Sequence, residues 1–222
     1  MESSDKDQEK KRITEDQTFP VPFSLNQINT HINLNTYDPI KTTKEKIINQ
    51  AFKFHSQGNT LEAEKYYKNF IRQGFKDERV FTNYGVILND LGKSQEAESL
   101  QRKAIELKPD FAEAHSNLGN LLKELGKLQD AELSYRKAIE IKPDYADAHY
   151  NLGVLLKDLG KLDEAIFCYE KAIDTDQNLE SALKGIGKVL LKKGNHSDGI
   201  IKLREAVGSI GFNPKKASIT IN

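Results

Sequence analysis

The sequence predicts an all-α fold, a solenoid of five helix-turn-helix units, and two observations carry this prediction. Glycines recur at a constant spacing of 34 residues, at Gly58, Gly92, Gly126, Gly160 and Gly194. Alanines recur in the same register, at Ala63, Ala97, Ala131 and Ala165. A period of this length is typical of repeat proteins, in which each unit buries its apolar face only against its neighbours.

The register divides the chain into an N-terminal segment, 1–43, a repeat region, 44–213, and a C-terminal tail, 214–222. The repeat region consists of five units: 44–77, 78–111, 112–145, 146–179 and 180–213. The third and fourth units are identical at 18 of 34 positions. We call the position of a residue, counted from the first residue of its unit, its place in the unit.

Each unit carries the marks of two helices. Leu118, Leu121, Leu122 and Leu125 fall on one face of a helix. Gly126 then ends that helix, since glycine readily takes the left-handed conformation. The second helix has an acid in its first turn in every unit, suited to the positive end of the helix dipole, at Glu62, Glu96, Asp130, Glu164 and Asp198. Pro109 and Pro143 stop the second helix from continuing.

The third unit, AEAHSNLGNLLKELGKLQDAELSYRKAIEIKP, resembles the tetratricopeptide-repeat (TPR) family, and the resemblance covers 44–213. It implies a right-handed superhelical solenoid whose first helices line a concave groove, with places 2, 5, 6, 9, 12 and 13 facing inward. The chain departs from the family at His115 and His149, which stand where tryptophan is usual. Packing between helices explains these histidines better than metal binding does.

The sixth place holds an asparagine in four units: Asn49, Asn83, Asn117 and Asn151. This row is similar to the asparagine ladder in the TPR region of O-linked N-acetylglucosamine transferases. An amide offers both a donor and an acceptor, so it can pair with the main chain of an extended peptide. The alternative is that these asparagines are solvated residues of the groove with no ligand.

Two further sets of polar residues are candidates for binding a partner. Asn120 occupies the ninth place of the third unit. Lys184, Lys188 and Lys192 form a basic stripe on the first helix of the fifth unit, which is either a binding surface or a solvated cap of the array. The residue pattern of the TPR clamp for chaperone C-termini is not matched.

Motifs of catalysis and cofactor binding are missing from the sequence. It has no H-E-x-x-H, G-x-S-x-G, Walker or dinucleotide-binding motif, so we expect a chain that is not an enzyme and binds no cofactor or metal. Cys168 is the single cysteine and is expected to be a buried apolar filler. Thirty-three basic residues balance thirty-three acidic ones, which gives no general attraction to nucleic acid or to anionic membranes.

These observations predict an adaptor or scaffold that binds an extended segment of a partner protein in the groove. An alternative is a non-catalytic substrate-docking arm, or a relic, of a TPR-containing transferase or oxygenase system. A third possibility is a self-assembling solenoid, although a monomer is favoured. Without a signal peptide or a long apolar run, a cytoplasmic protein is expected.

The ends of the chain differ from the repeats. Residues 1–43 are expected to form a disordered N-terminal segment that becomes extended over 19–43. Phe19, Val21 and Phe23 would either cap the first unit or contact the partner. Residues 214–222 form a C-terminal tail that ends in ASITIN, which alternates like a strand.

Overall fold

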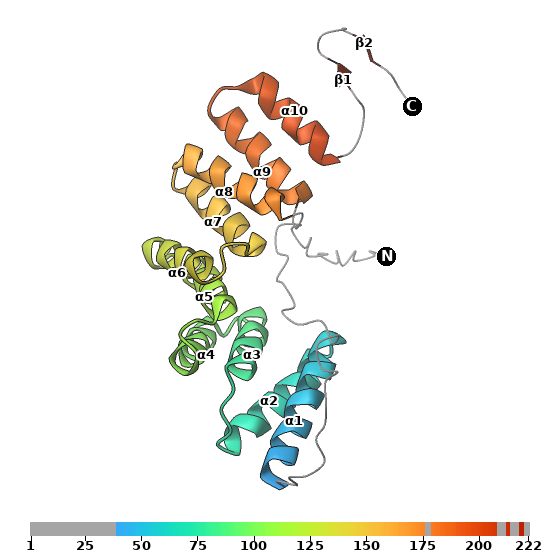
Figure 1. Ribbon diagram of the computed structural model, residues 1–222, viewed down its shortest axis with the longest axis vertical. Coiled ribbons are helices and arrows are strands. Elements are labelled where there is room, and N and C mark those ends of the chain that lie inside the picture. Colours follow the sequence, from blue (N-terminus) through green and yellow to red (C-terminus); the bar gives the residue numbers. More distant parts are fainter. Residues whose placement is uncertain (1–38, 176–178, 208–211, 214–217, 220–222) are drawn as a thin grey trace, which may run out of the picture. The chain divides into compact units, whose positions relative to one another are not determined.

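A computed structural model describes residues 39–175, 179–207, 212–213 and 218–219. These residues form ten helices, which follow one another as helical pairs (Figure 1). The first helices of the pairs are α1 (Pro39–Ser56), α3 (Glu78–Asp90), α5 (Ala112–Glu124), α7 (Ala146–Asp158) and α9 (Leu179–Lys192). The second helices are α2 (Thr60–Arg72), α4 (Ser94–Leu107), α6 (Leu128–Ile141), α8 (Leu162–Asp174) and α10 (His196–Val207).

The turn within each pair is made by the glycine that recurs every 34 residues. All five of these glycines have a positive φ, between 71° and 81°. At Gly126 the amide donates to the Lys123 carbonyl, and the next amide, of Lys127, donates back to Leu122. This is a Schellman arrangement, which satisfies carbonyls that the end of α5 leaves open. The predicted role of these glycines is confirmed.

The second helices of the central units end just before the prolines. The residue after α4 is Lys108, with φ −142°, and the residue after α6 is Lys142, with φ −131°. A residue that precedes proline is pushed toward extended backbone, so each helix stops there. The acids predicted for the first turn lie there in α2, α4, α6, α8 and α10.

Each pair packs through a small residue of its first helix and a large residue of its second. In the third unit Gly119 of α5 faces Tyr135 of α6: a Cβ built on Gly119 would lie 2.6 Å from Tyr135 Cε1. Gly153 faces Tyr169 in the same way. Both tyrosine side chains are fully buried. The second helix of each pair also contacts the first helix of the next, so the core continues along the stack.

The structure differs from the predicted boundaries at both ends of the array. Helix α1 begins at Pro39, inside the segment predicted to be extended, because proline fits the first turn of a helix, where its missing N–H is not needed. The last helix ends at Val207. Beyond it, β1 (Phe212–Asn213) pairs antiparallel with β2 (Ser218–Ile219), so the strand-like end of the sequence finds a partner.

Residues 1–38 lie outside the described part of the chain, and with them Phe19, Val21 and Phe23. The predictions for these residues therefore remain predictions. Among the described helices, none combines the length and the apolar character that crossing a membrane requires.

Candidate functional site

The first helices form a continuous surface, which we call the first-helix face: the residues of α3, α5, α7 and α9 at places 5, 6, 9, 12 and 13. Helix α3 contacts α5, α5 contacts α7, and α7 contacts α9. Two polar contacts join places 12 and 13 of neighbouring helices. Asn89 Nδ2 donates to Glu124 Oε2 at 2.8 Å, and Lys192 Nζ donates to the Lys157 carbonyl at 3.3 Å.

The four asparagines of the sixth place differ in their exposure to solvent. Asn49 on α1 is exposed, and Asn151 on α7 is partly buried. Asn83 on α3 is only 5% exposed and Asn117 on α5 only 7%. Their shared place in the repeat predicts that all four face the groove, and the burial of Asn83 and Asn117 differs from that prediction.

The burial has a cause in the neighbouring unit, where place 24 of the second helix abuts the sixth place of the following first helix. Tyr67, at place 24 of the first unit, hydrogen-bonds to Asn83. In the fifth unit the sixth place is Gly185, and a Cβ built there would lie 2.6 Å from Tyr169 Cζ. Asn83, and Gly185 at the same place of the fifth unit, thus lie at the seam between successive units.

Asn83 lies in a polar cluster around Tyr67. Burial raises the pKa of the Tyr67 phenol, and the hydrogen bond with Asn83 lowers it by a smaller amount. The Tyr67 hydroxyl lies 3.1 Å from His55 Nδ1. Asn83 Oδ1 is buried and has no hydrogen-bond partner among the described residues. A buried acceptor left unpaired lowers the stability of the fold.

Asn120, the other candidate on α5, is held by its own unit. The Tyr135 hydroxyl donates to Asn120 Oδ1 at 2.7 Å. This contact fixes the amide at the ninth place and leaves its NH₂ group to serve as a donor.

Two carboxylates at place 13, one of the places that the family resemblance puts on the inward side, belong to the same face. They are Asp90, the last residue of α3, and Glu124, the last residue of α5. Partial burial raises the pKa of the Asp90 carboxyl, and the negative charge of Glu124 raises it further. Their proximity follows from contacts between units, which the register alone does not reveal.

The basic stripe on α9 is partly engaged within the array. Lys184 forms a 2.6 Å ion pair with Glu180, one turn earlier on the same helix. Lys188 and Lys192 are exposed, and Lys192 donates to α7 as described above. The stripe therefore combines a solvated surface with a contact between units.

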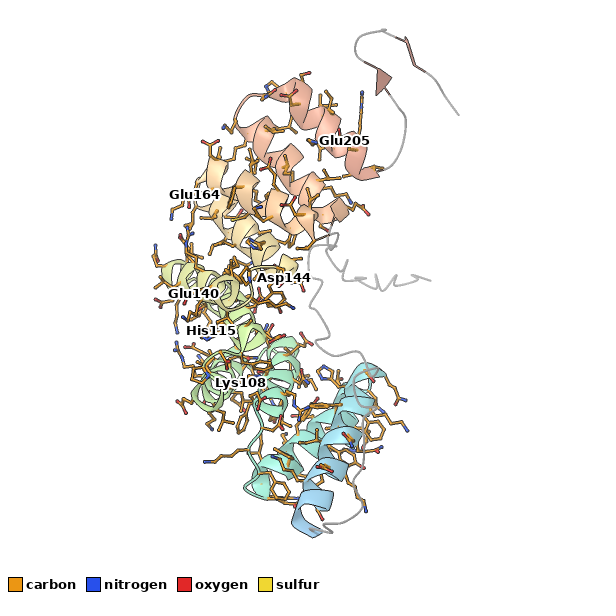
Figure 2. The ribbon with its side chains drawn as sticks, viewed as in Figure 1. Lys108, His115, Glu140, Asp144, Glu164 and Glu205 are labelled. Carbon is orange, nitrogen blue, oxygen red and sulfur yellow. The ribbon has the colours of Figure 1, made fainter. Side chains whose placement is uncertain are left out.

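The histidines that replace the family's tryptophan both bond to backbone. His115 Nε2 lies 2.9 Å from the Pro109 carbonyl oxygen, and His149 Nε2 lies 2.9 Å from that of Pro143 (His115 is labelled in Figure 2). Each ring thereby ties the start of a first helix to the turn before it. Among the described residues, no three histidine, cysteine or acidic side chains form a group that could hold a metal ion.

The recurring unit matches known repeat families. The family described as TPR repeat matches residues 85–126 and 119–160, and the family described as Tetratricopeptide repeat matches 146–179. No curated protein matches the chain significantly.

Solved structures of MamA share the fold. A crystal structure of MamA protein is 25% identical in sequence, with a TM-score of 0.64, and the match covers 75% of this chain and 91% of that one. A second crystal structure of MamA is 26% identical, with a TM-score of 0.63, and covers 71% and 92%. MamA 41-end from Desulfovibrio magneticus RS-1, at 22% identity, has a TM-score of 0.65 and covers 74% and 93%.

Proposed function

Because the chain is a tetratricopeptide-repeat protein, and such repeats build scaffolds for protein–protein interaction, we propose that its first-helix face binds an extended segment of a partner protein. The chain then acts as an adaptor with no catalytic step of its own. The asparagine row, which consists of Asn83, Asn117 and Asn151 on this face and Asn49 on α1, supplies donors and acceptors for the partner's main chain. Asn120, Lys184, Lys188 and Lys192 complete the proposed surface.

The observation that carries the proposal is the amide of Asn120 on this face, whose Oδ1 accepts from the Tyr135 hydroxyl at 2.7 Å. This contact fixes the orientation of the amide, so its NH₂ group can donate to a main-chain carbonyl of a bound segment. Extended peptides expose carbonyl and N–H groups at regular intervals, which suits amides that recur on stacked helices.

The test uses an array of peptides of about ten residues, which span roughly 33 Å when extended. The peptides that bind best are then titrated by calorimetry. Replacing Asn83, Asn117 and Asn151 by alanine should weaken their binding about ten- to a thousand-fold, because each lost neutral hydrogen bond contributes about 0.5–1.5 kcal/mol.

The control changes the same three units on their second helices. Ser99, Leu133 and Phe167 occupy place 22 there, and all three are exposed. Replacing them by alanine should leave the affinity unchanged. Full affinity in the triple asparagine variant, or a loss in the control of equal size, would contradict the proposed binding surface.

A further inference from the structure

We propose that one side of α10 is a second binding surface, which takes an amphipathic helix of a partner protein. We call this side the end face, and its apolar residues are Ile200, Leu203 and Val207. The partner helix packs on it as α9 packs on α8 within the chain. Because the end face lies on a second helix of the array, the proposal does not depend on binding at the first-helix face.

Contacts within the chain show which places of a second helix face the next unit. At place 21, Glu132 accepts from Lys161 of the next unit at 2.9 Å. At place 24, the Tyr169 ring lies against Gly185, where a Cβ would be 2.6 Å from Tyr169 Cζ. At place 28, Ile105 packs against the core cluster of the following units. Places 21, 24 and 28 follow the spacing of helical turns, so they form one stripe along the helix.

In α10 this stripe is apolar and open to solvent. Its three places hold Ile200, Leu203 and Val207. Ile200 is 43% exposed and Val207 is 62% exposed, whereas Ile166 and Ile173, at the same places of α8, are partly buried. The described residues beyond Val207 are the two strands, so no helix of the described part of the chain covers the stripe. The end face therefore continues the interface between units without the helix that completes it elsewhere.

The other end of the array is closed by charged residues. First helices meet the preceding unit through places 3 and 10, since Ala114 and Leu121 belong to the core cluster of the first two units. From the second unit to the fifth, these places hold apolar side chains that are at most 2% exposed. In α1 they hold Lys46 and Lys53, and both are exposed. A second copy of the chain would have to bury two ammonium groups to place α1 on the end face, which argues against that occupant.

The end face thus fits a helix with the pattern that α9 shows to α8. That pattern is Ala182, Gly185 and Val189, at positions i, i+3 and i+7 of one helical face. The central small residue lets the two helices approach closely, as Gly185 does at Tyr169. Helices that bind to a surface of another protein commonly use apolar residues at this spacing.

The experiment uses two labelled peptides, each held helical by a covalent staple, and the full chain. The first peptide has the sequence of α9, Leu179–Lys192. The second carries lysine in place of Ala182 and Val189, which reproduces the residues of α1 at these places. We expect the second peptide to bind at least about ten-fold more weakly in fluorescence anisotropy, because its two charges would be buried in the contact.

The variant that tests the surface is Ile200→Lys with Val207→Lys. It should weaken binding of the first peptide at least about ten-fold, since the apolar contact is lost. The matched control is Leu133→Lys with Phe167→Lys, which adds the same charge at second-helix residues that are 67% and 57% exposed. The control should bind like the parent, and thermal melts verify that both variants are folded.

Labelling of a Val207→Cys variant identifies what covers the end face. The rate is measured for each thiol by mass spectrometry, because Cys168 is also present. In the chain alone, at low and at high concentration, the new thiol should react at about the rate of a Leu133→Cys variant. Addition of the first peptide should slow the reaction at Val207→Cys only.

Three results would overturn the proposal. Slow labelling at every chain concentration would mean that residues of the chain itself cover the end face. Slow labelling that appears only at high concentration would mean that a second copy covers it. The absence of peptide binding, or binding that survives the lysine substitutions in the peptide or in α10, would mean that the end face does not take a helix.

Discussion

Lys161 donates across a unit boundary to Glu132, with Nζ 2.9 Å from Oε2. Lys161 immediately precedes α8, and Glu132 lies on α6 of the unit before. The contact recurs one unit earlier, where Lys127 Nζ lies 3.0 Å from Glu98 Oε2. Each glutamate also accepts from an arginine four residues later on its own helix, Arg102 or Arg136. Places 16 and 21 thus build an ion-pair ladder along the second helices.

The ladder should contribute measurably to the stability of the array. We expect Glu132→Gln to lower the free energy of unfolding by about 1 kcal/mol, since exposed ion pairs contribute about 0.2–1 kcal/mol each and Glu132 has two partners. Thermal melts at low and high salt measure the effect, which should diminish at high salt. Glu140→Gln serves as the control, because Glu140 is exposed and is paired with Lys137 on its own helix (Figure 2). An equal loss in both variants would contradict a role for the contact between units.

The same glutamates should make stability depend on pH. Hydrogen bonds from Arg102 and Lys127 lower the pKa of the Glu98 carboxyl. Burial alone would raise the pKa of Glu132, but the hydrogen bonds from Lys161 and Arg136 outweigh it, and the net shift is downward.

A carboxyl whose pKa is lower in the folded state stabilises the fold above its unfolded pKa, and this contribution is lost as pH falls through the folded pKa. The parent chain should therefore lose stability between about pH 5 and pH 3. The Glu98→Gln/Glu132→Gln variant should lose less over the same window, as melting temperatures at each pH can measure. Parallel pH curves for the two proteins would show that these pairs make no contribution.

The contact of Gly119 with Tyr135 leaves no room for a side chain. A Cβ at Gly119 would lie 2.6 Å, 2.7 Å and 3.0 Å from three atoms of a ring that is fully buried. Overpacking of this kind typically costs about 1–3 kcal/mol, so Gly119→Ala should destabilise by that amount and Gly119→Leu by more. Ala131→Leu, at another fully buried small residue, should have a similar effect. The exposed change Leu133→Ala should alter stability by at most about 0.5 kcal/mol. Melting temperatures of Gly119→Ala and Leu133→Ala that coincide would refute the packing argument.

Burial should also make the thiol of Cys168, the single cysteine, unreactive in the folded chain. Cys168 is 6% exposed, and burial raises the pKa of its thiol to about 11. Since the thiolate is the reactive form, labelling by a thiol reagent near neutral pH should be slow in the folded chain and rapid after denaturation. The time course of labelling with and without denaturant measures this. Rapid labelling of the folded chain would indicate frequent local opening of α8.

Most of the fold could be predicted from the repeat period, because turn glycines, first-turn acids and prolines act on the backbone within a few residues. The roles of Gly126 and Pro109 follow from backbone conformation within a few residues, and both were predictable. Contacts between units were not, since they depend on how each pair is rotated against the next. The recurrence of tyrosine at place 24, in Tyr67, Tyr135 and Tyr169, was a signal in the sequence that could have indicated the large partner of the glycines.

The candidate surface was less predictable than the fold for the same reason. Family resemblance put Asn83 on the groove side of its helix, but its burial depends on Tyr67 of the preceding unit. The pairing of Asp90 with Glu124 likewise depends on a side chain from the neighbouring helix, Asn89. The repeat register predicts which face of a helix a residue lies on. The exposure of that residue and its ionic partners can be determined only from the structure of the stacked units.

The last prediction concerns the stability of the asparagine row itself. Replacing Asn83, Asn117 and Asn151 by alanine should leave the array as stable as the parent, or more so. Alanine is the better helix former by roughly half a kcal/mol per residue, and the change removes the buried oxygen of Asn83 that lacks a partner. If the asparagines instead stabilise the packing between units, the triple variant should be less stable than the parent.

Thermal melts of the triple variant distinguish these cases, and a double-mutant cycle locates the cause. The cycle combines Asn83→Ala with Tyr67→Phe, which removes the hydroxyl that bonds to Asn83. A coupling free energy below about 0.5 kcal/mol would mean that the amide contributes little to the seam between the first two units. A drop of several degrees in the triple variant, with a coupling of about 1 kcal/mol or more, would instead make these asparagines structural. The row would then owe its presence to the seam between units rather than to a ligand.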